Sequence, residues 1–139
     1  MRIRSGIAPF TMIAVLLAGG TAAATVGSAS AAEPKTNAIK AACLDTATRY
    51  TGTPGSGSSN AHWPATGTYA YTTNKCLDIN LKVDATRKIR ACFKATGSCN
   101  GWKTARAGQW ALAATDVKDG SGFYIQFQGT ARSTGLIAY

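Results

Sequence analysis

The stretch CLDINLKVDATRKIRACFK, residues 76–94, decides the fold. Apolar and polar residues alternate in it with a period of two, on both sides of a turn near residues 84–86. That period predicts a hairpin of two β-strands, 76–83 and 88–94, each with one buried and one solvent-facing side. The predicted inward side chains are Leu77, Ile79, Leu81, Val83, Ile89, Ala91 and Phe93, and the outward ones are Asp78, Asn80, Lys82, Lys88, Arg90 and Lys94.

Four shorter runs beside this stretch have the same texture and are separated by turn residues, at 68–72, 109–115, 122–128 and 136–139. In 122–128 the alternation directs Phe123, Ile125 and Phe127 inward. In 109–115 it places Trp110 in the core, and 136–139 is expected to be a final edge strand. About six strands, with no segment long enough for a crossover helix after residue 66, predict an all-β domain, a small antiparallel β-sandwich or barrel.

Cysteine usage predicts two disulfides. Cys43, Cys76, Cys92 and Cys99 are even in number, and a zinc site is disfavoured because no C-x-x-C occurs and the chain has a single histidine. We favour Cys92–Cys99, which encloses a turn-like ATGS, together with Cys43–Cys76, but the other two connectivities stay open. In the chain-entropy model the short loop contributes about 2.5 kcal/mol and the longer one about 4 kcal/mol.

The first 32 residues predict where the protein works. Arg2 and Arg4 precede an apolar run at 7–18, and the small residues ASAA at 29–32 end it. This pattern is typical of a secretory signal peptide, cleaved after Ala31 or Ala32, because the apolar run is too short to span a bilayer. We therefore expect a secreted, extracellular protein in an oxidising setting, without membrane insertion.

The mature chain is expected to hold one domain at 65–139, preceded by a flexible segment and linker at 33–64. In residues 33–50 the spacing of Ile39, Ala42 and Cys43 is that of one face of a short helical turn, and GSGSS at 55–59 lacks periodicity. Fifteen Lys and Arg against six Asp and Glu give a net charge of +9, and loss of the two leader arginines lowers it to +7. No heptad pattern argues for an oligomer, so a monomer is expected.

Groups that could perform catalysis are few, and we expect no enzyme, no cofactor and no metal. His62 stands alone in the Gly/Ser-rich stretch and is interpreted as an ordinary loop histidine. Asp78 is interpreted as a charge partner of the basic residues across the predicted hairpin. Asp116 and Asp119 make a poor calcium cage because Lys118 lies between them. Neither G-x-S-x-G nor a phosphate-binding glycine loop occurs.

The positive feature is a basic, partly aromatic exterior, with Trp102 expected to be half exposed. Such a surface attracts polyanions or acidic glycans, and a tryptophan beside a lysine stacks on a sugar ring or a base. The alternative interpretation is an ordinary solvated surface whose lysines prevent strand aggregation. The predicted ligand-binding residues are Lys82, Lys88, Arg90, Lys94, Trp102, Lys103 and Arg106. The sequence thus predicts a non-catalytic binding protein.

The alternative function is a secreted serine protease inhibitor that acts through the loop 99–109, CNGWKTARAGQ. Cys99 anchors that loop, and Lys103 or Arg106 suits a trypsin-like pocket. An ordinary β-turn loop is the simpler interpretation of the same residues. A membrane-active protein ranks last, because no amphipathic helix with a basic face is visible.

The motifs CLDIN, RACF, CNGWK, GQW and ATDVKDG, between residues 76 and 120, carry a resemblance. With its Ala/Thr/Gly-rich composition, the chain resembles uncharacterised small, secreted two-disulfide β-proteins of actinobacteria. The resemblance implies a source and a fold type, and transfers no activity and no site residues. The chain differs from amylase inhibitors of the tendamistat type, because the Trp-Arg-Tyr triplet that those proteins insert into amylase is absent.

Overall fold

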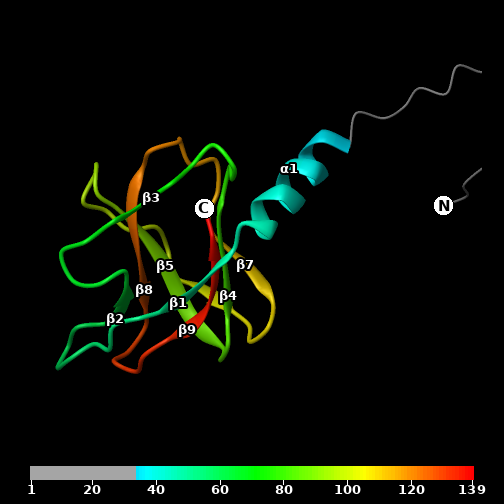
Figure 1. Cartoon of the computed structure of the whole chain (residues 1–139). Helices are drawn as coiled ribbons and strands as arrows, with labels where there is room; N and C mark the ends of the chain where they lie inside the picture. Colours follow the sequence, from blue (N-terminus) through cyan, green and yellow to red (C-terminus); the bar gives the residue numbers. More distant parts are fainter. Residues whose placement is uncertain (1–33) are drawn as a thin grey trace, which may run out of the picture. The chain divides into compact units, whose positions relative to one another are not determined.

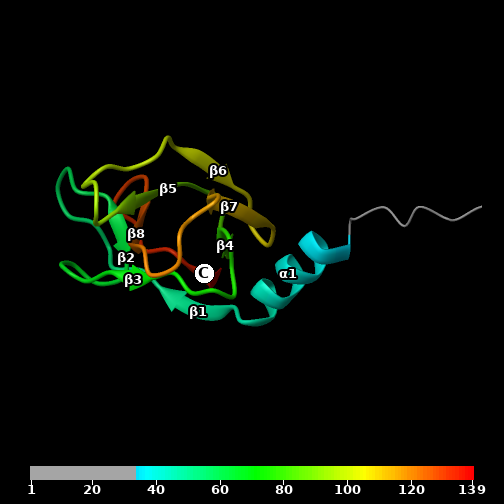
Figure 2. The ribbon, with the colours of Figure 1, turned by 90° about the horizontal axis from the view of Figure 1, so that it is seen from above.

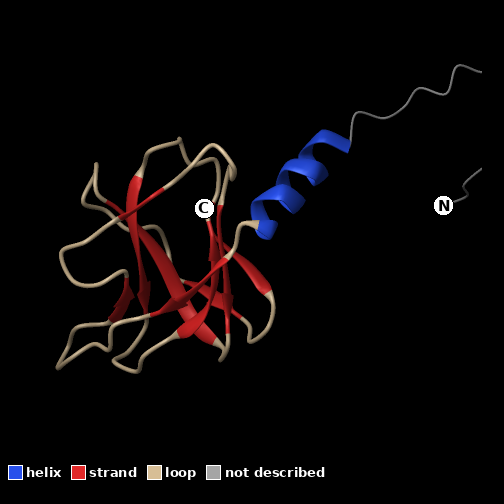
Figure 3. Cartoon of the chain, in the orientation of Figure 1, coloured by secondary structure: helices blue, strands red, loops and turns tan. Residues whose placement is uncertain are grey.

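The computed structural model describes residues 34–139, so the predicted signal peptide lies outside the described residues. This part of the chain forms one helix and nine strands (Figures 1 and 3). They are α1 (Pro34–Asp45), β1 (Thr48–Thr51), β2 (Ala61–Trp63), β3 (Ala70–Tyr71), β4 (Ile79–Val83), β5 (Arg87–Phe93), β6 (Lys103–Ala105), β7 (Trp110–Ala114), β8 (Gly122–Phe127) and β9 (Thr134–Ala138).

The strands form two antiparallel sheets, and the prediction of an all-β fold with two disulfides is confirmed. One sheet has the order β1-β9-β4-β7, and the other has the order β2-β8-β5-β6 with β3 also paired to β8. Within residues 34–139 no helix has the length and apolar character needed to cross a membrane.

The core lies between the two sheets and follows the period-two pattern of the strands. Phe123, Ile125 and Phe127 of β8 are fully buried, whereas Tyr124 and Gln126 between them are half-buried. Each large apolar side chain removed from water in this way contributes about 1.5–3 kcal/mol. The other large side chains that the core buries fully are Tyr50, Ile79, Leu81, Val83, Ile89 and Ile137.

The predicted hairpin of residues 76–94 is wrong. β4 pairs with β7 and β9, while β5 pairs with β6 and β8, so the two strands belong to different sheets. The turn at 84–86 carries the chain from one sheet to the other. The two strands can then face each other across the core with their apolar sides, which the alternation alone did not distinguish from a shared sheet. Lys82 is consequently separated from Lys88, Arg90 and Lys94.

Several predicted orientations also need correction. Leu77 precedes β4 and is 55% exposed, whereas Asn80, expected outside, is 3% exposed and donates to the Cys43 sulfur at 3.4 Å. Trp110 is half-buried and lies outside the main core, because it pairs with the outward-facing Lys82. Its ring centroid is 5.8 Å from the Lys82 ammonium.

Residues 48–63, which the sequence assigned to a flexible linker, contain β1 and β2. β1 pairs with β9 and β2 pairs with β8, so both belong to the sheets. Tyr50 of β1 is only 2% exposed and stacks on Phe127 with ring centroids 5.7 Å apart. Because β1 adds beyond β9, the last strand is an interior strand and not the predicted edge. Pairing with strands far along the chain therefore orders this segment, although its composition predicts flexibility.

Both favoured disulfides are present. Cys43–Cys76 attaches the end of α1 beside β9, where the two cysteines form a small buried cluster with Ala138. Cys92–Cys99 joins the end of β5 to the chain that follows a turn, across an isolated antiparallel bridge. Gly97 in that turn has a φ of 65°, a conformation that favours glycine. Figure 2 views the fold at right angles to Figure 1, with β6 of one sheet next to β7 of the other.

Candidate ligand-binding face

The outer side of the sheet β2-β8-β5-β6 gathers four of the seven predicted ligand-binding residues. Lys88, Arg90 and Lys94 alternate outward along β5 and just beyond it, and Trp102 immediately precedes β6. Lys82 lies on β4 in the other sheet. Lys103 and Arg106 lie in and just after β6, at the edge that adjoins β7.

One row of side chains crosses this sheet from edge to edge. His62 is opposite Gln126, and Gln126 is opposite Arg90, in the strand register. Arg90 Nε donates a hydrogen bond of 2.8 Å to Gln126 Oε1. The Arg90 guanidinium also lies over the Trp102 ring, 4.4 Å from its centroid. A cation over a tryptophan face is attracted by the ring quadrupole, so Trp102 and Gln126 hold Arg90 from two sides.

A second row lies farther along the sheet and contains Lys94. Lys94 Nζ donates to the Tyr71 hydroxyl at 2.9 Å and lies 5.3 Å and 5.5 Å from the ring centroids of Tyr69 and Tyr71. Gly122 separates Tyr71 from Lys94, and an added Cβ would lie 3.1 Å from each side chain. The glycine therefore lets the two side chains meet. The hydrogen bond to Tyr71 holds the pKa of the exposed Lys94 ammonium above its usual value.

Tyr124 connects the two rows. Its ring meets Tyr69 edge-on at 6.1 Å between centroids, and its hydroxyl accepts a long, 3.5 Å hydrogen bond from Gln126 Nε2. Side chains thus touch continuously across the sheet, with aromatic rings beside cations. We call this set the aromatic–cation face: Trp102, Arg90, Gln126, Tyr124, Tyr69, Lys94 and Tyr71.

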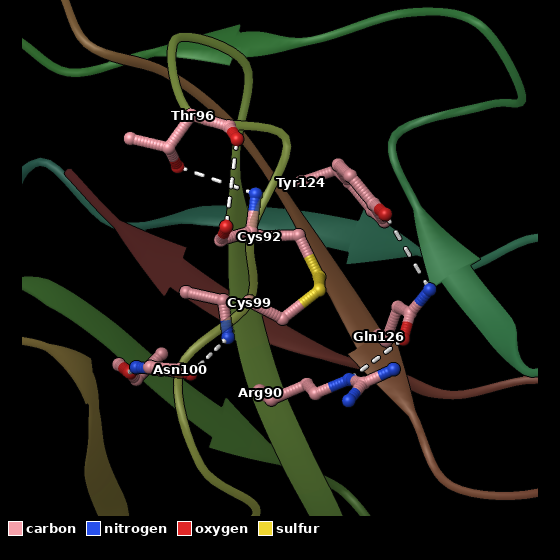
Figure 4. Close-up of a disulfide and its surroundings, with 10 residues drawn as sticks. Arg90, Cys92, Thr96, Cys99, Asn100, Tyr124 and Gln126 are labelled. Atoms are coloured by element: carbon pink, nitrogen blue, oxygen red, sulfur yellow. Dashed lines mark hydrogen bonds between the residues drawn. A yellow bond between two sulfur atoms is a disulfide. The ribbon is translucent and has the colours of Figure 1, made fainter.

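The Cys92–Cys99 disulfide supports this face from within. Cys92 is opposite Tyr124 in the register, and Figure 4 shows the disulfide between Arg90 on one side and the turn that bears Thr96 on the other. The bridge fixes the chain that leads on to Trp102. It thereby fixes the distance between Trp102 and Arg90.

The positive charge of the face has no acidic neighbour that neutralises it. The one ion pair among the described side chains, residues 40–139, joins Arg49 to Asp84 at 3.7 Å, and both side chains are half exposed or more. Asp78 forms no ion pair with a basic residue of the predicted hairpin and instead accepts a hydrogen bond from the Asp116 amide at 3.1 Å. Lys88, Arg90 and Lys94 are therefore available to an anionic partner.

The segment 99–109 is only partly a loop. Lys103 belongs to β6, paired with Ile89, and its ammonium donates to the Leu112 carbonyl at 3.2 Å. Arg106 is exposed on the turn that follows. Arg106 therefore lies on a turn that is held by hydrogen bonds from the Ala107 amide to the Thr86 hydroxyl and from the Gly108 amide to the Val83 carbonyl. The protease-inhibitor alternative stays a prediction.

A cavity of about 650 Å³ adjoins the face, and sequence reasoning missed it. Residues 54–69 form most of its wall, and Tyr124 and Gln126 complete it from β8. His62, interpreted as an ordinary loop histidine, lines this cavity and lies 2.9 Å from the Thr66 hydroxyl through Nε2. The only signal in the sequence was the density of Ser, Thr and Asn around that histidine, which equally predicts a solvated linker.

The described residues lack any group of three or more His, Cys, Asp or Glu that could hold a metal ion. The aromatic–cation face likewise presents stacking surfaces, cations and amides, which suit binding by contact. No family model, no curated protein and no solved structure matches the chain. The resemblance to small secreted actinobacterial proteins therefore stays a prediction.

Proposed function

We propose that this chain is a non-catalytic, secreted binding protein that recognises an acidic glycan through its aromatic–cation face. The observation that carries the proposal is the continuous contact from Trp102 through Arg90 and Gln126 to Tyr124, Tyr69 and Lys94. Two disulfides are consistent with an oxidising, extracellular setting.

The face offers aromatic rings for the apolar surface of a sugar ring and cations for its acidic group. Aromatic rings pack against the apolar face of a sugar ring, and Arg90 and Lys94 supply charge for carboxylate or sulfate groups. Arg90 has a planar fork of donors, and Gln126 occupies only its Nε, so its terminal nitrogens can bind an anion in a bidentate manner. Because neighbours already hold these side chains, binding orders fewer of them and loses less entropy.

The test is a titration of the disulfide-bonded protein with heparin, polygalacturonate, neutral dextran and single-stranded DNA at low and high salt. We expect binding of an acidic polysaccharide that weakens as salt rises, because salt screens exposed charges. Arg90→Ala and Lys94→Ala should each weaken it about tenfold, which is about 1.4 kcal/mol.

Lys82→Ala is the matched control, since it removes the same charge from the other sheet. If Lys82→Ala and Arg90→Ala weaken binding equally, net charge alone explains the binding, and the proposed face is refuted. Absence of binding to every acidic polysaccharide would refute the function itself. Binding to single-stranded DNA alone would assign the face to a different class of polyanion and also refute it.

A further inference from the structure

The cavity beside the aromatic–cation face differs from that face in its chemistry. Its wall contains no Lys, Arg, Asp or Glu side chain. The groups that line it are hydroxyls from serines and threonines, the amides of Asn60 and Gln126, the His62 imidazole, and the rings of Tyr69 and Tyr124. Its volume of about 650 Å³ falls within the range of about 300–1,000 Å³ that is typical of small-molecule sites.

The loop that forms one part of the wall is fixed by hydrogen bonds to residues 129 and 130. Gly55 N donates to the Thr130 carbonyl at 2.9 Å, and the Gly129 amide donates to Asn60 Oδ1 at 3.0 Å. A Cβ at Gly55 would collide with the Ser59 carbonyl oxygen, so this loop closes on itself more tightly than any other residue there would allow. The Gly/Ser-rich segment is therefore a built wall of the cavity.

A second part of the wall is a turn that hydrogen bonds within the turn hold. The Thr68 amide and hydroxyl both donate to the Ala65 carbonyl, at 3.0 Å and 2.6 Å. Thr66, within the turn, is connected to β2 through its 2.9 Å contact with His62 Nε2. The cavity thus lies between two anchored segments, and its polar groups are placed before a ligand arrives.

We propose that this cavity binds one uncharged sugar unit of the glycan. The inference rests on the proposed function and specifies its substrate class. Hydroxyls, amides and an imidazole can exchange hydrogen bonds with the hydroxyls of a sugar, and the tyrosine rings offer a stacking surface. A charged unit would lack an ion-pair partner of the usual kind there, because no Lys, Arg, Asp or Glu side chain lines the wall.

Gln126 connects the two sites, since it lines the cavity and accepts the Arg90 hydrogen bond. A glycan that enters the cavity with an uncharged unit therefore places its next unit near Arg90. The ligand is then a polymer in which a neutral sugar adjoins an acidic one. A neutral sugar alone would occupy only the cavity, and an acidic sugar alone would occupy only the region near Arg90.

The experiment is a titration of the ¹⁵N-labelled, disulfide-bonded protein with methyl glucoside, methyl galactoside and N-acetylglucosamine, followed by NMR. We expect one of these sugars to shift the amide signals of residues 54–69, 124 and 126. Thr66→Phe, which places a ring beside His62, should weaken that sugar at least tenfold, whereas Thr66→Ser should retain binding because it keeps the hydroxyl. Thr115→Phe, on an exposed site after β7, is the size-matched control and should change nothing.

The two proposals fail separately. If an acidic polysaccharide binds through Arg90 but no sugar shifts the cavity signals, the cavity inference is wrong and the proposed function stands. If a neutral sugar binds in the cavity and no acidic polysaccharide binds, the acidic class is wrong. Equal effects of Thr66→Phe and Thr115→Phe would also overturn the cavity inference.

Discussion

Asn100 is the residue whose replacement tests this structure most directly. It lies between the Cys92–Cys99 bridge and β6, and its side chain joins the two sheets. Ala91 N in β5 donates to Asn100 Oδ1 at 2.8 Å, and Asn100 Nδ2 donates to the Ala113 carbonyl in β7 at 2.6 Å. Asn100 N also donates to the Ala91 carbonyl at 2.9 Å, so the residue continues the edge of β5 before β6 begins.

Asn100→Ala leaves one donor and one acceptor without partners at residues that are fully buried, Ala91 and Ala113. A buried polar group that loses its partner costs about 1–3 kcal/mol, so the pair costs about 2–6 kcal/mol. We expect about 2–4 kcal/mol, the lower part of that range, because Asn100 itself is half-buried and water reaches part of the gap. This loss is a large share of the free energy of unfolding of a domain of ordinary stability.

The measurement is urea unfolding of the oxidised protein, followed by tryptophan fluorescence and far-ultraviolet circular dichroism. Asn74→Ala is the matched control, since Asn74 is exposed on a turn. A difference between Asn100→Ala and Asn74→Ala below about 0.5 kcal/mol, the usual range of surface substitutions, would refute the argument.

Three further predictions concern stability. Burial raises the pKa of Tyr50 from 10.0 to about 12, so its contribution is fully present below pH 10 and lost as the pH rises toward 12. Between pH 10 and pH 12 the free energy of unfolding of the wild type should fall by about 2 kcal/mol more than that of Tyr50→Phe, and parallel curves would contradict this. Gly135→Ala should destabilise by about 1–3 kcal/mol, because an added Cβ collides with a β4 carbonyl, whereas Gly101→Ala has open space and should change little in the same urea assay. Replacing Cys92 and Cys99 together by Ala should lower the free energy of unfolding by about 2.5 kcal/mol and weaken the binding of an acidic polysaccharide, and an unchanged affinity would exclude a role of the bridge in holding the face.

The strand pattern that determines stability also determines which side chains are available for recognition. The same rule of alternation that buries Phe123 and Ile125 places Tyr124 and Gln126 outside, where they become part of the face and of the cavity. Both proposed binding sites therefore include side chains from the outer side of β8. Changes there that leave the inward residues intact separate binding from folding.

The sequence by itself determined the strands with the strongest alternation and the sides they bury. Ile89 and Ala91 in β5 and Phe123, Ile125 and Phe127 in β8 are buried as the pattern predicts. It also favoured both disulfide pairs, including the short Cys92–Cys99 loop around a turn. The buried faces and the short Cys92–Cys99 loop depend on neighbours within a few residues, since a strand's two faces repeat with a period of two.

The tertiary structure alone decided which strands pair and what the Gly/Ser-rich segment does. Tyr50 and His62 belong to strands of the sheets only because β9 and β8, far along the chain, supply their hydrogen-bond partners. Trp110 lies outside the core because β7 pairs with β4 in a register that sets it beside Lys82. The cavity forms where three separate segments meet. Alternation indicates which face of a strand is apolar. Sheet partners and register depend instead on contacts between distant residues, which form only when the chain folds.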